Sequence, residues 1–98
     1  MHAWLCDNPI GPEALKWTEL PTPEPQAGEV RVAVRCASLN FPDLLIVQNK
    51  YQLKPPLPFV PEAELSGVIE AVGPGVTQLQ VGMAVASSGG IGGFGSHV

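Results

Sequence analysis

A short apolar segment closed at both ends by turn-forming residues is the strongest constraint on the fold of this chain. Leu65 to Val72 contains eight residues, and Gly73-Pro74-Gly75 follows it directly. An apolar run of this length between Pro and Gly residues is typical of a strand, since helices are usually longer. Four prolines lie between Pro55 and Pro61, and proline cannot donate to a β-ladder. These features predict a β fold that is rich in turns.

Further strands are predicted on both sides of this segment. From Glu29 to Ala37 valines alternate with other residues, which is typical of a strand with one buried face. Shorter strands are expected at three places: Met1 to Leu5, Leu15 to Leu20 and Met83 to Ser87. A turn through residues 8–12 would join the first two as a hairpin. A last strand is expected to begin at Gly95.

One helix is predicted, from Phe41 to Gln48. Asn40 precedes it, and Asn is among the best residues for capping the N-terminus of a helix. Pro42 would lie in the first turn, where its missing N–H is not needed. Asp43 follows three positions after the cap, where a carboxylate complements the exposed amides and the helix dipole.

Composition indicates a single small domain over residues 1–98. Of the 98 residues 45% are hydrophobic, enough to bury one core but seldom two. Eleven Gly and eleven Pro favour turns, while 14% charged residues is too few for a disordered chain. The net charge is −4 and no basic cluster is present, which argues against nucleic-acid binding.

The cysteines and the N-terminus indicate a cytoplasmic protein. Cys6 and Cys36 are far apart in the sequence and form neither a redox pair nor a metal-binding spacing. We expect two reduced thiols; a disulfide would require secretion, and strand-like residues follow Met1 where a signal peptide would lie. No apolar run approaches the roughly 18 residues that cross a bilayer. No membrane association is therefore expected.

Several short motifs carry a resemblance to a known family. Residues 61–64 read Pro-Glu-Ala-Glu, and residues 72–76 read Val-Gly-Pro-Gly-Val. They resemble the Pro-Gly-His-Glu tetrad and the Val-Gly-x-Gly-Val turn of the medium-chain dehydrogenase/reductase superfamily. Residues 28–30, 49–51 and 81–85 match it as well. The resemblance implies a mainly β fold with one short helix, the GroES-like, partly open β-barrel of the N-terminal catalytic domain.

The departures from these motifs imply the zinc-independent branch, the NADPH:quinone oxidoreductases. Zinc-dependent members carry Cys-His-x-Asp after the first long strand and a His in the tetrad, where this chain has Asn40-Phe41-Pro42-Asp43 and Ala63. A catalytic zinc needs about three protein ligands, so we expect no metal. Glu62 replaces the usual Gly of the tetrad and is expected to cause backbone strain or block a pocket.

Four residues are candidates for the site that the resemblance implies. The candidate catalytic residues are Tyr51 and Asn40, and the candidate cofactor-binding residues are Asn40, Asp43 and Glu64. The family places this Tyr beside the nicotinamide, where a phenol can stabilise charge on a substrate oxygen; the alternative is an ordinary half-buried aromatic residue. Asn40 would orient a carbonyl or only cap the helix. A structural role is favoured for Asp43, since a carboxylate in the first helical turn needs no further reason, whereas Glu64 would either face the cleft or make structural hydrogen bonds.

The segment from Gly90 to Gly95 is not expected to bind a dinucleotide, although its sequence fits G-x-G-x-x-G. That motif needs a following helix to receive the pyrophosphate, and three residues remain after Gly95. NADPH is the cofactor of the full-length family, and this domain alone should bind it weakly. His2 and His97 have no partner at catalytic spacing, which favours exposed or packing roles.

The function implied by the resemblance is reduction of quinones or enones by hydride transfer. This chain corresponds to the N-terminal part of such an enzyme and should be inactive alone, because it lacks the dinucleotide-binding half. Two alternatives remain: a binding or interaction module that uses the exposed face of the barrel, and a structural fragment. Because loss of the second domain would expose apolar surface, self-association or a homodimer is expected.

Overall fold

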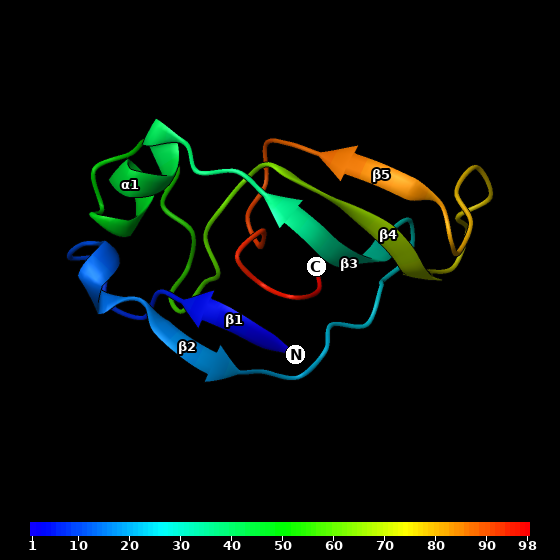
Figure 1. Ribbon diagram of the computed structural model, residues 1–98, viewed down its shortest axis with the longest axis horizontal. Coiled ribbons are helices and arrows are strands. Elements are labelled where there is room, and N and C mark those ends of the chain that lie inside the picture. The colour runs from blue at the N-terminus through cyan, green and yellow to red at the C-terminus, as the bar shows by residue number, and fades with distance from the viewer.

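Two small antiparallel sheets and one short helix make up residues 1–98 in the computed structural model (Figure 1). The first sheet pairs β1 with β2, and the second has the strand order β3-β4-β5. The elements are β1 (His2–Leu5), β2 (Lys16–Glu19), β3 (Val30–Ala37), α1 (Phe41–Val47), β4 (Leu65–Val72) and β5 (Ala84–Ser87). A 3₁₀ turn, Pro12–Ala14, precedes β2. The mainly β fold with one short helix is confirmed.

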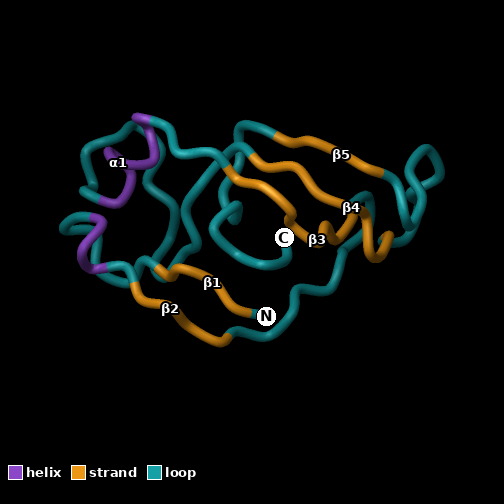
Figure 2. The backbone as a smooth tube through the Cα atoms, in the orientation of Figure 1, coloured by secondary structure: helices purple, strands orange, loops and turns teal.

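The end of the chain joins the two sheets. Figure 2 shows this loop passing between β1 and β3. It forms one bridge to β1, Ala3 with Gly95, and one to β3, Ala33 with His97. The expected last strand is thus present as isolated bridges and not as a continuous strand. The result is a partly open barrel, as predicted.

The second sheet follows the predicted segments, with one difference in β3. The bounds of β4 are those predicted. Within β4, Gly67 has no room for a Cβ, which would collide with the Ala33 carbonyl oxygen of β3. The β3–β4 register shifts between Arg31 and Val32 and again between Val34 and Cys36. Such bulges re-aim side chains, so the simple alternation predicted for β3 is interrupted.

Small differences separate the other predicted and observed elements. The helix ends at Val47, one residue early, and β5 begins at Ala84 instead of Met83. The connection from β1 to β2 is longer than a hairpin turn, because Pro12 starts a 3₁₀ turn there. No helix is long and apolar enough to span a membrane.

An apolar cluster packs α1 against the chain around residue 59. Its buried members are Cys6, Ile46, Val47 and Phe59, and Leu15 and Tyr51 pack against them. Cys6 and Phe59 also exchange two backbone hydrogen bonds, of 2.8 and 3.0 Å. Both cysteines are free, as expected, with Cys6 buried and Cys36 exposed. This packing fixes α1 relative to the residues that lead into β4.

Candidate functional site

Five polar side chains gather where β3 ends and β4 begins. We call them the polar cluster: Ser38, Asn40, Asp43, Glu62 and Glu64. Two come from the loop after β3, one from the first turn of α1 and two from the turn before β4. The Ser38 N–H donates to the Glu64 carbonyl at 3.2 Å, which holds the two loops together. Three of the four predicted site residues therefore lie in one cluster.

Asn40 is the N-cap of α1, as predicted. The Asp43 carboxylate accepts the Asn40 N–H at 3.0 Å, and the Asp43 N–H donates to the Asn40 carbonyl at 3.1 Å. The Asn40 side-chain amide donates to Ser38 Oγ at 2.7 Å and to Glu64 Oε2 at 3.1 Å. Asn40 thus serves both the helix and the cluster, while Asp43 is buried and tied to the helix start.

Glu62 is the most constrained residue of the cluster. Its φ is 88° and its side chain is fully buried. A positive φ is strained for a residue with a Cβ, so the strain expected from the Gly replacement is confirmed. Glu62 Oε1 accepts the Glu64 N–H at 2.6 Å and the Ser38 hydroxyl at 3.4 Å. Glu62 Oε2 has no hydrogen-bond partner.

Burial, together with the neighbouring Asp43 carboxyl, raises the pKa of the Glu62 carboxyl to about 6. Hydrogen bonds from the Glu64 N–H and the Ser38 hydroxyl act in the opposite direction but do not outweigh burial. Two adjacent carboxyl groups away from water cannot both ionise easily. The Glu62 carboxyl therefore keeps its proton to a higher pH than an ordinary glutamate.

This arrangement predicts a pH-dependent stability. Between the ordinary value of 4.5 and about 6, the folded protein keeps a proton that the unfolded chain releases, so stability falls as pH rises. The loss should total on the order of 2 kcal/mol. Urea unfolding at pH 4.5 and 7 would measure it, and Glu62→Gln should remove it. Glu13→Gln, at an exposed position, is the matched control; an unchanged pH dependence in Glu62→Gln would contradict the assignment.

A groove of about 500 Å³ lies beside the polar cluster. Its lining is Cys36, Ala37, Ser38, Glu64, Leu65, Ser66, Ala86, Ser87 and Ser88. Ser38 and Glu64 belong to both the groove and the cluster, and the exposed Cys36 places a thiol in the wall. Sequence reasoning missed the groove because its walls come from the ends of three strands that are distant in sequence.

Tyr51 lies outside this arrangement. Its half-buried ring packs against the apolar cluster near Ile46 and Phe59, and it does not line the groove. None of the hydrogen bonds of the polar cluster involves it. The structure brings Asn40, Asp43 and Glu64 together and leaves Tyr51 on the core side of α1.

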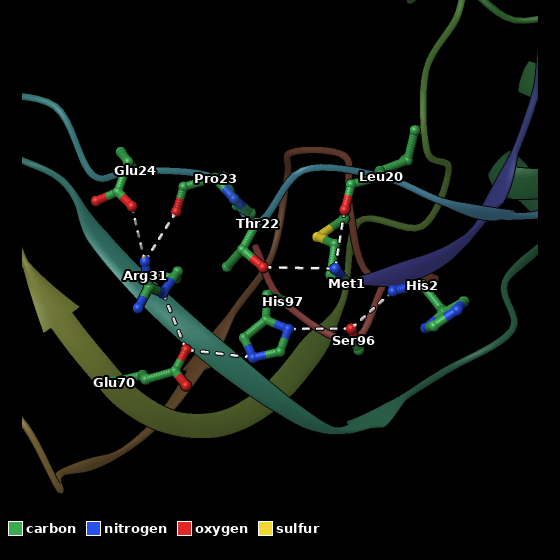
Figure 3. A network of polar contacts seen from close by, with 10 residues as sticks. All are labelled: Met1, His2, Leu20, Thr22, Pro23, Glu24, Arg31, Glu70, Ser96 and His97. Atoms are coloured by element: carbon green, nitrogen blue, oxygen red, sulfur yellow. Dashed lines mark hydrogen bonds and ion pairs between the residues drawn. The ribbon is translucent and has the colours of Figure 1, made fainter.

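His97 has partners that sequence reasoning did not find. Figure 3 shows Glu70 between Arg31 and His97, with Glu70 Oε2 at 2.9 Å from Arg31 Nε and at 3.2 Å from His97 Nε2. The Arg31 hydrogen bond lowers the pKa of Glu70. Ser96 Oγ lies 3.0 Å from His97 Nδ1 and accepts the His2 N–H at 3.2 Å. No partner at catalytic spacing in the sequence was expected for His97; β3 and β4 bring Arg31 and Glu70 to it from distant positions.

The Gly-rich segment uses its amides inside the chain. The N–H groups of Gly92, Gly93 and Phe94 donate to the carbonyls of residues 60, 62 and 61 at 2.8, 3.0 and 3.1 Å. Gly93 also lacks room for a Cβ, which would lie 2.6 Å from Glu62 Cγ. Amides that cradle phosphates must be free, so this segment does not fit the pyrophosphate of NADPH. No group of three or more His, Cys, Asp or Glu residues is placed to hold a metal ion.

Comparison with known proteins gives the family. Residues 26–96 match the model of the alcohol dehydrogenase GroES-like domain. The chain is 41% identical over 92 residues to the quinone oxidoreductase-like protein 2 homolog of Nematostella vectensis, covering 94% of this chain and 25% of that protein. The chain therefore belongs to the alcohol dehydrogenase GroES-like domain family and, within it, resembles the quinone oxidoreductases of the medium-chain dehydrogenase/reductase superfamily.

Solved structures agree with this assignment. A probable oxidoreductase from Mycobacterium abscessus is 36% identical with a TM-score of 0.90, over 100% of this chain and 31% of that one. The Escherichia coli quinone oxidoreductase, solved in complex with NADPH, is 27% identical with a TM-score of 0.91, over 100% of this chain and 30% of that one. The chain thus spans about a quarter to a third of the length of these relatives.

Proposed function

We propose that residues 1–98 form the N-terminal, substrate-side domain of a zinc-independent, NADPH-dependent oxidoreductase that reduces quinones or enones in the cytoplasm. The observation that carries this proposal is the groove beside the polar cluster, in a chain whose relatives include quinone oxidoreductases. The nicotinamide supplies the hydride when it is bound. Since the Gly-rich segment does not fit the phosphates, cofactor binding would fall to a second domain.

The proposal gives each site residue a role. Asn40, held by Ser38 and Glu64, orients the carbonyl or carboxamide group that enters the groove. Glu64 lines the groove itself, whereas the buried Asp43 acts through the Asn40 backbone. Tyr51 lies outside the groove lining, so its phenol would hydrogen-bond a substrate oxygen where the substrate extends beyond the groove, and it keeps its proton.

Turnover of the whole enzyme tests the proposal. Oxidation of NADPH would be followed with a benzoquinone, an α,β-unsaturated ketone and, as the control, the corresponding saturated ketone. We expect oxidation with the first two acceptors, because both accept hydride at carbon without a Lewis acid. Equal rates with the saturated ketone, or no oxidation with any acceptor, would overturn the proposed function.

Zinc independence makes a separate prediction. Elemental analysis of protein washed with a chelator should find less than about one tenth of a metal ion per chain, because Asn40 and Ala63 stand at the two ligand positions and neither supplies a thiolate or an imidazole. Activity should survive the wash. One zinc per chain that is lost together with activity would refute the zinc-independent assignment.

A further inference from the structure

The polar cluster contains a buried carboxyl group that the proposed function does not use. Glu62 is fully buried and its Oε2 has no hydrogen-bond partner. A buried ionised carboxylate with an unpaired oxygen is costly, so the site favours a neutral carboxyl. The titratable groups that face Glu62 are Asp43 from α1 and Glu64 from its own turn. Both are acids, so no cation lies beside Glu62 to stabilise its carboxylate. Protonation of the Glu62 carboxyl removes the charge instead.

Ser38 connects this buried group to the groove. Its hydroxyl oxygen lies 3.4 Å from Glu62 Oε1 and 3.0 Å from Glu64 Oε2, and it lines the groove. The Asn40 amide donates to the same oxygen at 2.7 Å. A hydroxyl oxygen has two lone pairs and one O–H donor. The Asn40 amide uses one lone pair of Ser38 Oγ. The other lone pair can accept the Glu62 proton while the Ser38 O–H donates its proton toward the groove. Proton transfer takes place over about 2.6–3.2 Å; the 3.4 Å contact with Glu62 is slightly longer, and catalytic hydrogen bonds are often long without substrate and tighten when it binds.

We propose that Glu62 and Ser38 form a proton path that supplies the proton of the reduction to a substrate oxygen in the groove. This inference rests on the proposed function. A quinone becomes a hydroquinone by gaining one hydride, which the reduced nicotinamide supplies with both electrons, and one proton. The Ser38 O–H bond breaks as its proton moves to the substrate oxygen, and the Glu62 carboxyl proton moves to Ser38 Oγ. Glu62 is left as a carboxylate and regains a proton from solvent.

The proton path from Glu62 to Ser38 depends on a residue that the family's Pro-Gly-His-Glu tetrad does not contain. The tetrad of the resembling family has Gly where this chain has Glu62, so the carboxyl is an addition that the backbone accommodates at a φ of 88°. A strained residue persists only where its surroundings hold it. Here Gly93, which has no side chain, provides the space against Glu62 Cγ.

Carboxyl titration tests the buried proton directly. In protein labelled with ¹³C at glutamate carboxyls, the signal that disappears in Glu62→Gln belongs to Glu62. We expect it to titrate near pH 6 and to shift in Ser38→Ala. Ser66→Ala changes another serine of the groove lining and should leave it unchanged. Titration of Glu62 below pH 5 would overturn the path whatever the enzyme reduces.

Turnover tests the path itself. Ser38→Ala should lower kcat for a benzoquinone about 100-fold, the lower end of the range for general acid catalysis. Ser38→Thr, which keeps the hydroxyl, and Thr77→Ala, at an exposed position outside the groove lining, should leave kcat close to that of wild type. In wild type kcat should fall as pH rises above 6, and Glu62→Gln should abolish that dependence. If the enzyme reduces quinones and Ser38→Ala retains full kcat, the path is wrong and the proposed function stands. If wild type reduces no quinone or enone, both fall.

Discussion

Replacing Phe59 with alanine should lower the free energy of unfolding by about 3–5 kcal/mol, the usual cost of removing a buried phenylalanine ring. Phe59 is the largest side chain of the apolar cluster and is only 5% exposed. It packs with Ile46 and Val47 of α1, while its backbone pairs with Cys6. The cavity would therefore loosen the contact that positions α1 against the turn carrying Glu62 and Glu64.

Urea unfolding monitored by circular dichroism would measure this loss. Val81→Ala provides the control, because Val81 is 62% exposed and surface substitutions usually change stability by less than about 0.5 kcal/mol. Equal effects of the two substitutions would mean that Phe59 does not belong to the main core.

Replacing Tyr51 with phenylalanine in the whole enzyme should lower kcat about 100-fold, the typical effect of removing one hydrogen-bond donor aimed at a developing oxyanion. The dissociation constant for NADPH should remain close to that of wild type, because the phenol is proposed to contact the substrate and not the nicotinamide. The ring itself is retained, so its packing against Ile46 and Phe59 should keep the thermal unfolding temperature nearly constant.

Steady-state kinetics with several quinones and enones, together with a fluorescence titration of NADPH, would separate these effects. Wild-type turnover in Tyr51→Phe across all acceptors would leave Tyr51 with only the packing role that its position against the apolar cluster already supports. A weaker affinity for NADPH with unchanged kcat would instead place the phenol against the cofactor.

The elements that were predicted correctly depend on local patterns. The bounds of β4 follow from an apolar run between turn residues, and the start of α1 follows from Asn40, Pro42 and Asp43, whose capping preferences act within a few residues. The strain at Glu62 was also predictable, because a residue with a Cβ stands where the motif has Gly.

The features that were not predicted depend on pairing between distant segments. The bulges in β3 arise from its register against β4, which no local pattern specifies. The proximity of Glu62 to Asp43 brings the turn before β4 to the first turn of α1, and the Glu70 partner of His97 comes from β4. In each case the residue types were visible in the sequence, but their proximity was set by the barrel.

The bridging segment at residues 94–98 has a consequence for the order in which the protein assembles. His2 and Ser96 are hydrogen bonded although they are 94 positions apart, and contacts of such separation form slowly because a long loop must close first. During synthesis on the ribosome, the β1–β2 pair and the β3–β4–β5 sheet can each form early. The bridges from Gly95 to β1 and from His97 to β3 can form only after these residues emerge. Until then the edges of β1 and β3 that they cover stay unpaired, and chaperones would meet the chain in that state.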